Sequence, residues 1–438
     1  MKRIPFSILT LLATTALRAQ QPTRLPDELR SLIQQANTNF PQLKQQQEQI
    51  KAGDVRVDIV RTALKPNVSG NVSYLYIDPV SKATIPVNGR DATVQFQPNH
   101  NVNAAVSAGQ TLYDWGRTGA SIRQAQDNVQ LLKRSLDITQ QNLGYQVAAA
   151  YYGVGFLQKS LTVQDSVIKT AGANVTILTN RLKNGDALLF DVLTQEVRVK
   201  TALNARIEQQ NQLDRQLALL TYLTGNLTPI SGPITTQFDA TVQPFTVEGQ
   251  LQTALSAHKD LLLAQARVRS AETEIQINTL SSRPSLTANA SAGFRNGYLP
   301  NINAPRANLT AGVSLSVPIY SGKRYSLQNQ AAQLSLNASR YAVETASAQL
   351  RQSLAQLDAD IRSNQSRLRN LETQVVQARK ALAIATARLR NGVITPVELE
   401  SAETGVEQAE LGQLGFQYQL LLNQLELKRL SGESLVVN

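Results

Sequence analysis

The sequence predicts an α+β fold in which membrane-spanning β-strands continue into very long coiled-coil helices. Three observations predict it: a twofold internal repeat, segments of about ten residues in which apolar side chains alternate, and longer segments in which they recur about every 3.5 residues. The 438 residues are 42% apolar but only 5% aromatic and 17% charged. Compact enzymes of this length use more aromatic side chains in the core and more charge on the surface, so two or three ordinary globular domains are doubtful.

The N-terminal residues 1–19 have the pattern of a secretory signal peptide. Lys2 and Arg3 precede an apolar segment that is too short to cross a membrane. Cleavage is expected after Ala19, with a cut after Ala16 as the alternative. Removal of residues 1–19 reduces the formal net charge from +11 to +8. Because an exported protein does not meet the genome, no nucleic-acid partner is expected, and the remaining positive charge is assigned to solvated polar surfaces.

Two copies of one unit of roughly 210 residues make up the mature chain. The segment 181–185 recurs as 388–392, an offset of 207 residues. The same offset pairs Leu223-Thr224-Gly225 with Leu430-Ser431-Gly432. Each copy should therefore have the same architecture, although neither need fold independently.

Four segments of about ten residues, two in each copy, have the alternation of half-buried strands. Val68 and Tyr74 share one face of the first segment, and Ser69 shares the other with small polar residues. The strand pairs are expected within residues 65–114 and 283–320. A transmembrane strand needs about 9 to 11 residues. For a single segment, a soluble sandwich with one wet face is an equal alternative; the export signal and the four matched segments together favour a membrane barrel.

Four strands cannot close a barrel inside lipid, where every strand edge must be paired. Two chains would give eight strands around a filled interior, whereas three would give twelve strands and room for a pore. Tyr113, Trp115 and Tyr320 lie where strands are expected to end, as in an interfacial aromatic girdle, or as ordinary packing residues. Residues 77–100 and 295–307 are expected to be outward loops.

A very long helical pattern follows each strand pair. Apolar residues repeat with 4-3-4-3 spacing from Leu143 to Leu182 and again from Leu350 to Leu389, which is typical of coiled-coil packing. Each long helix is expected to stop at an Asn-Gly pair and return as a second helix. The expected boundaries are 20–64 for an N-terminal helix, 115–225 for the first helical hairpin, 226–246 for a connector, 247–282 for a further helix, 321–432 for the second hairpin and 433–438 for a tail.

No enzyme chemistry is predicted. The chain has no cysteine and two histidines, so a histidine metal site would need both His100 and His258. Motifs for a serine nucleophile, a zinc protease or a phosphate-binding loop are absent from the sequence. We therefore expect no catalytic residue, no cofactor and no metal.

Four motifs, in their order and spacing, resemble the TolC family of outer-membrane efflux proteins. They are Leu112–Arg117 and Ile319–Lys323 at strand ends, and Asn184–Asp191 and Asn391–Glu398 at helix turns. The resemblance covers essentially the whole mature chain. It implies a homotrimer with a twelve-stranded barrel in outer-membrane lipid, continuous with an α-helical coiled-coil tunnel in the periplasm. It also implies a periplasmic adaptor and an inner-membrane pump as partners, and the role of exit duct for tripartite efflux or type I secretion.

In that family, acidic residues just after the second turn constrict the periplasmic entrance. The resemblance places Glu398 there, with Ser401 where the family has a second acid. Ile394 and Asp191 are also implied entrance residues. Ile394 replaces an arginine that latches the entrance of the best-studied member, and Phe190 replaces a hydroxyl just before Asp191. That particular latch is therefore not expected in this protein.

Both the acidic residue and the turns have a plainer interpretation. Three copies of Glu398 would form a cation-favouring ring, but a carboxylate at this place also caps a helix N-terminus. Gly185 and Gly392 are expected helix caps, and with Asn184 and Asn391 they are also the implied adaptor-docking tips. A periplasmic adaptor and a structural coiled-coil protein of the envelope are the alternatives. An adaptor would have one helical hairpin within a compact β domain, and a purely structural coiled coil would not need the strands.

Overall fold

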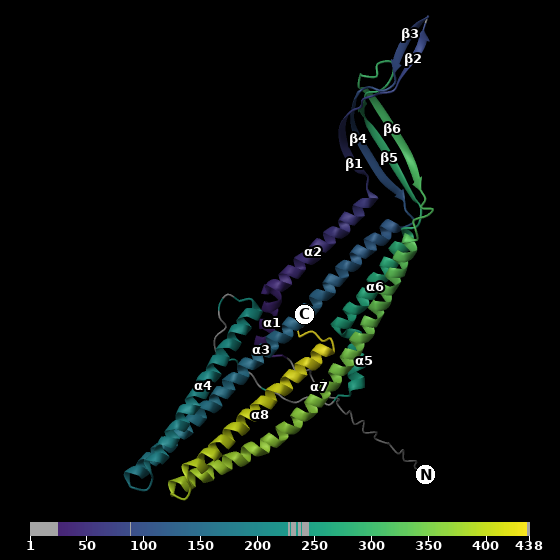
Figure 1. Cartoon of the computed structure of the whole chain (residues 1–438). Helices are drawn as coiled ribbons and strands as arrows, with labels where there is room; N and C mark the ends of the chain where they lie inside the picture. Colours follow the sequence, from purple (N-terminus) through teal and green to yellow (C-terminus); the bar gives the residue numbers. More distant parts are fainter. Residues whose placement is uncertain are drawn as a thin grey trace, which may run out of the picture.

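The molecule is elongated, with strands at one end and helical hairpins extending to the other (Figure 1). The computed structural model describes residues 25–87, 89–226, 228, 234, 238 and 245–435. The expected signal peptide with both cleavage positions, most of the connector and the last three residues of the tail lie outside the described residues.

Four long strands form one antiparallel sheet. They are β1 (Asn67–Tyr76), β4 (His100–Tyr113), β5 (Ser285–Arg295) and β6 (Arg306–Ser316), in the order β1-β4-β5-β6. The first copy thus supplies one half of the sheet and the second copy the other, joined by the β4–β5 pairing. The register aligns Ser69 with Ser107, Ser107 with Ser291, and Ser291 with Thr310 across the four strands. Because side chains alternate between the faces, this register gathers the small polar residues on one face.

The opposite face of the sheet is apolar and uncovered in a single chain. Val72 is 79% exposed and Leu309 is 77% exposed, and Val68, Val106 and Val313 are exposed as well. A hollow on the polar face is lined by serine, asparagine, threonine, alanine and glycine residues of all four strands. A sheet with one apolar and one polar face is what a membrane barrel requires if lipid lies outside and water inside.

The segment expected to be the first outward loop contains a second, smaller sheet. Strands β2 (Lys82–Val87) and β3 (Arg90–Gln95) form an antiparallel hairpin beyond the end of the main sheet (Figure 1). The prediction of a loop over the whole of residues 77–100 is therefore wrong for β2 and β3.

Two helical hairpins continue from the sheet. The first is α3 (Arg117–Lys183) with α4 (Leu189–Thr224), and the second is α7 (Arg324–Arg390) with α8 (Pro396–Leu430). Both long helices have 67 residues and begin 207 residues apart, so the repeat seen in the sequence is a repeat of structure. At about 1.5 Å per residue each long helix extends roughly 100 Å. The two hairpins pack against each other where α8 contacts α3 and α4.

Each of the shorter helical stretches is interrupted, whereas the sequence predicted one continuous helix in each place. The first consists of α1 (Asp27–Asn39), α2 (Pro41–Arg61) and the short helix η1 (Thr62–Leu64), and the second of α5 (Val247–Ala257) and α6 (Lys259–Leu280). Phe40 between α1 and α2 is extended, with ψ 121°, because proline disfavours a helical residue before it. His258 has nearly the same conformation, with ψ 124°, although no proline follows it.

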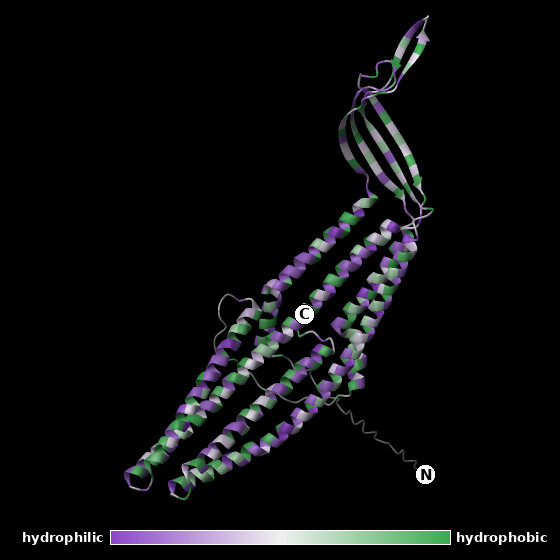
Figure 2. Cartoon of the chain, in the orientation of Figure 1, coloured by the Kyte–Doolittle hydropathy of each residue, from purple (hydrophilic) through white to green (hydrophobic). Residues whose placement is uncertain are grey.

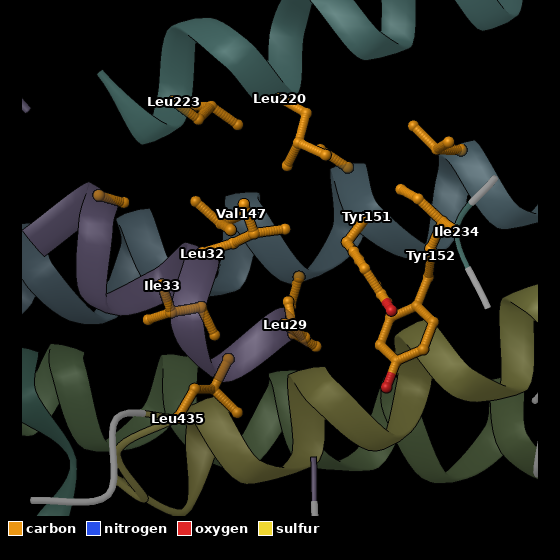
Figure 3. Close-up of a cluster of buried hydrophobic side chains, with 14 of the residues drawn as sticks. Leu29, Leu32, Ile33, Val147, Tyr151, Tyr152, Leu220, Leu223, Ile234 and Leu435 are labelled. Carbon is orange, nitrogen blue, oxygen red and sulfur yellow. The ribbon is translucent and has the colours of Figure 1, made fainter. Parts of the chain in front are cut away.

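The largest apolar core lies where α1 packs on the first hairpin. Leu29, Ile33, Val147, Tyr151 and Leu220 are at most 1% exposed and interlock from three helices (Figure 3). A buried side chain of this size contributes roughly 1.5 to 3 kcal/mol. Elsewhere along the hairpins hydrophobic and hydrophilic residues alternate in narrow stripes, as expected for thin coiled-coil seams (Figure 2).

In the described part of the chain, no helix is both long enough and apolar enough to cross a membrane. The predicted fold class, strands for a barrel continuous with a coiled-coil helical region and a twofold repeat, is confirmed.

Candidate functional site at the helical tips

The two hairpin tips lie at the end of the molecule opposite the sheet, and each turns at a glycine. Gly185 has φ 81° and Gly392 has φ 74°, the left-handed conformation that other residues rarely adopt. The residue that follows each glycine donates its amide to a helix carbonyl. Asp186 donates to the Arg181 carbonyl at 2.8 Å, and Val393 donates to the Arg388 carbonyl at 2.9 Å. These bonds satisfy the last carbonyls of α3 and α7, so both glycines are helix caps.

Asn184 and Asn391 precede these glycines as the C-terminal cap residues of α3 and α7. Both are exposed at the extreme end of the molecule. The four tip residues named from the sequence therefore lie where a partner could reach them.

Acidic residues begin the return helices at both tips. The Glu398 Oε2 accepts hydrogen bonds from the Thr395 amide at 2.8 Å and from the Thr395 hydroxyl at 3.0 Å. The Asp191 Oδ2 accepts from the Leu188 amide at 3.0 Å. Each carboxylate thus caps the N-terminus of a helix, which is the plainer of the two interpretations weighed for Glu398.

The cap has an electrostatic consequence for Glu398. The amide of Thr395 lowers the pKa of the Glu398 carboxyl most strongly, and the Thr395 hydroxyl and the positive charge of Arg388 lower it further. Glu398 is exposed and remains ionised at neutral pH. Ser401 lies one helical turn later and is also exposed, so both residues lie on one side of α8.

Ile394 has an apolar role at the second tip. It packs on a small core formed by Leu178, Val192, Leu389 and Leu399, which joins the ends of all four hairpin helices. An ionic latch from this position is therefore replaced by an apolar contact.

A different arginine connects the two tips. Arg181 lies in the last turn of α3 and donates from Nη1 to the Leu389 carbonyl at 2.8 Å and from Nη2 to the Asp186 carbonyl at 2.7 Å. Its guanidinium lies against Gly392, where a Cβ atom would be 2.8 Å from Nη2. We call this contact the Arg181 clasp. It joins the first tip to the second, and a side chain at residue 392 would force the guanidinium to move.

In the sequence, Arg181 is recognisable only as part of a repeated motif. Its counterpart in the repeat, Arg388, makes no side-chain hydrogen bond or ion pair in the described part of the chain. The repeat therefore does not reveal which of the two arginines reaches across.

A buried polar cluster lies between the hairpins, roughly two turns from the tips. Its members are Asn174 of α3, Gln195 and Arg198 of α4, and Glu403 and Glu407 of α8. Glu403 is 3% exposed and accepts from the Asn174 amide nitrogen at 2.6 Å and from the Gln195 amide nitrogen at 3.3 Å. Arg198 Nη2 donates to Glu407 Oε2 at 2.6 Å, whereas its Nε lies 3.8 Å from Glu403. We call these five residues the inter-hairpin cluster.

Burial dominates the electrostatics of this cluster. It raises the pKa of Glu403, against the hydrogen bonds from Asn174 and Gln195 and the positive charge of Arg198. Glu400 on the same helix adds to the rise. A group so placed is sensitive to any movement that admits water between α4 and α8.

The sequence contains a signal for this cluster in the spacing of α8 and α4. Glu403 stands between Leu399 and Val406, at a spacing that elsewhere is buried and apolar. Gln195 and Arg198 likewise interrupt the buried face that begins at Val192. Polar residues on a coiled-coil seam indicate a specific buried contact.

The three residues of the expected girdle lie at the junction of sheet and helices. The rings of Tyr113 and Trp115 are in edge contact, with centroids 4.7 Å apart, and Tyr320 is 84% exposed. All three are exposed in the single chain, and an interfacial role remains a prediction.

Comparison with known proteins identifies the class of molecule. The family model described as "Outer membrane efflux protein" matches residues 32–226 and 250–433. Outer membrane protein TolC of Escherichia coli strain K12 is 23% identical over 419 residues, which cover 93% of this chain and 82% of TolC. Outer membrane efflux protein BepC of Brucella suis is 23% identical over 390 residues, 88% of this chain and 78% of BepC. The crystal structure of outer membrane protein VceC of Vibrio cholerae has a TM-score of 0.75 at 18% identity, covering 93% of this chain and 97% of VceC.

Proposed function

The chain belongs to the outer membrane efflux protein family, and from this premise we propose that three copies close into one continuous channel-tunnel. The protein is an outer-membrane exit duct and not an enzyme. Trimeric closure, the adaptor and pump, and the entrance residues are the parts that we propose.

The free edges of the sheet carry the argument for a closed oligomer. Strands β1 and β6 each pair on one side only within the chain. Inside lipid an unpaired strand edge leaves backbone groups without partners, so β6 must pair with β1 of another copy. The antiparallel order makes β6 run opposite to β1, which allows an antiparallel junction between copies. Three copies give twelve strands, wide enough for a pore.

Exposed apolar residues on the helices support the same assembly. Leu334 and Tyr341 of α7, Val55 of α2 and Ile207 of α4 are all more than half exposed in one chain. Adjacent copies packed side by side would cover such residues and continue the coiled-coil seams around a tunnel.

An adaptor is the proposed partner at the tips, with an inner-membrane pump behind it. Around Asn184 and Gly185 the first tip exposes Leu188, Leu189 and Phe190, the last at 69%. An exposed apolar group of this kind fits the end of a partner's helical hairpin better than it fits water. At the second tip, Asn391 and Gly392 occupy the equivalent exposed position and are proposed to contact the same partner.

At the entrance, Glu398 is proposed to line a ring of three carboxylates that favours cations. Glu398 can cap α8 and line the entrance at the same time. The cap uses Oε2, and the carboxylate remains exposed and ionised at the tip. The Arg181 clasp and the inter-hairpin cluster would hold this entrance closed, since both join the two hairpins of one chain and both must break if the hairpins separate.

Detergent extraction of outer membranes tests the assembly. We expect a detergent-dependent trimer by mass measurement, and single-channel steps when it is added to a planar bilayer. A soluble monomer without channel activity would contradict the proposal. In the same bilayers, Glu398→Gln should reduce cation preference, measured as a shift of the reversal potential in a KCl gradient. An unchanged reversal potential would leave Glu398 with its capping role alone.

A further inference from the structure

The four long strands carry almost no charge. Among their residues, only Arg295 at the end of β5 and Arg306 at the start of β6 are formally charged at neutral pH. His100, at the start of β4, is their single histidine. No carboxylate occurs in these strands. The two arginines are therefore the dominant charges along the whole length of the sheet.

The register places the two arginines side by side on the polar face. Arg295 is the direct partner of Arg306, and on its other side it is paired with Asn103. Stepping by two residues along β6 from Arg306 leads to Asn308, Thr310 and Gly312, and the last two line the polar hollow. Both guanidinium groups therefore belong to the face that looks into the lumen, and not to the face that meets lipid.

The pair lies at the end of the sheet farthest from the helices (Figure 1). Since the helices are on the periplasmic side, this end is the outer mouth of the barrel. Like charges directly opposite each other destabilise an antiparallel pair. Such a pair is not what strand stability alone would select.

Neither arginine is neutralised by a nearby acid. In the part of the chain that the structure describes, no carboxylate forms an ion pair with Arg295 or Arg306. Arg306 donates from Nη1 to the Leu299 carbonyl at 3.0 Å, which orients its guanidinium but leaves its charge uncompensated. Both residues are exposed, so their remaining donors are available to a ligand.

We propose that Arg295 and Arg306 of three chains form a ring of six guanidinium groups at the outer mouth, and that this ring binds and passes multivalent anionic solutes. The inference rests on the proposed trimeric closure. A lumen lined by one sign of charge concentrates counterions, and guanidinium groups bind phosphate and carboxylate oxygens in pairs. The outer mouth thus prefers anions, whereas Glu398 at the opposite end favours cations.

A sided block experiment tests the ring. The full-length trimer is inserted into a planar bilayer in one orientation, and inorganic tripolyphosphate is added to the side of the strands or to the side of the helical tips. We expect block from the strand side at low concentration. In the double variant Arg295→Gln and Arg306→Gln the half-blocking concentration should rise by a factor on the order of 10.

Three controls separate charge from structure. The double variant Arg295→Lys and Arg306→Lys retains the charge and should keep most of the block. Arg90→Gln removes a positive charge from β3, on the same side of the membrane but outside the four strands, and should leave the block unchanged. If the double glutamine variant does not insert, each single variant should show an intermediate rise.

The outcomes also distinguish this inference from the proposed function. An equal block in wild type and the glutamine variants, or block only from the tip side, would overturn the arginine ring while the channel stands. An absence of conductance steps in wild type as well would overturn the channel and the ring together.

Discussion

The two hairpin tips have nearly the same backbone but different surroundings. Gly185 and Gly392 cap equivalent helices with φ values of 81° and 74°. A Cβ atom at Gly185 would meet open space, whereas one at Gly392 would collide with Arg181. The difference shows that the repeat determines the backbone of both tips. The contacts between the tips depend on the few positions at which the side chains of the two copies are placed differently.

The inter-hairpin cluster has the same asymmetry. The first hairpin supplies two amides and an arginine, and the second supplies two carboxylates. At the repeat offset Arg198 corresponds to Gly405, and Glu403 corresponds to the exposed Glu196. The hairpins are thus complementary halves of one contact, although the two copies share one sequence pattern.

The largest expected effect comes from removing the cluster's only arginine. Arg198→Met leaves Glu407 without its partner at a mostly buried site and should weaken the contact between α4 and α8 by about 3 to 5 kcal/mol. Hydrogen exchange of the α8 amides around Glu403 measures this as faster local opening. Arg206→Met is the matched control in the same helix, because its ion pair with Asp165 is exposed and contributes about 1 kcal/mol or less. Equal exchange in the two variants would contradict the role of the cluster.

The comparison of the tips predicts a smaller effect for the two glycines. Gly185→Ala and Gly392→Ala both place a side chain at positive φ, so both should lose a similar amount of cap stability, roughly 1 kcal/mol. Only Gly392→Ala also displaces the Arg181 clasp, which should add about 1 to 3 kcal/mol. We expect a higher open probability in bilayers for Gly392→Ala alone. If both alanine variants opened equally, the clasp would have no part in closure.

The smallest effect concerns pH. Burial raises the pKa of Glu403 above its ordinary value of 4.5, so the folded state favours the protonated form. The stability gained in this way is present below pH 4.5 and is lost as the pH rises through the raised pKa. Glutamine imitates the protonated acid, so Glu403→Gln should be more stable than wild type at pH 8 and should approach it on acidification.

The matched control for this pH series is Glu196→Gln, the exposed counterpart of Glu403 in the first hairpin. Its thermal midpoint should follow that of wild type at each pH. A difference between Glu403→Gln and wild type that grows on acidification would show that the sign is wrong.

Periodicity predicted the parts of the fold that depend on local sequence. The alternation around Val68 and Tyr74 predicted β1, and the seam from Leu143 to Leu182 predicted α3, because burial of one face repeats along each element. The break at Phe40 was missed although Pro41 signals it in the sequence.

The contacts between elements could not be derived in the same way. Arg181 and Leu389 are 208 residues apart, and only the packing of the two tips brings them together. The pairing of Arg295 with Arg306 follows from the register of β5 and β6, which an alternating pattern permits in several forms. The sequence therefore predicted the turns at Gly185 and Gly392, but not the residues that contact them.

The strand order has a consequence for how the molecule forms. The hydroxyls of Ser107 and Ser291 meet across the β4–β5 junction from positions 184 residues apart in the chain. Each helical hairpin can form from local contacts, whereas the central strand pair must wait for the second copy to be synthesised and exported. We expect the sheet to be completed late, because β1 and β4 can pair within the first copy while the other edge of β4 waits for β5.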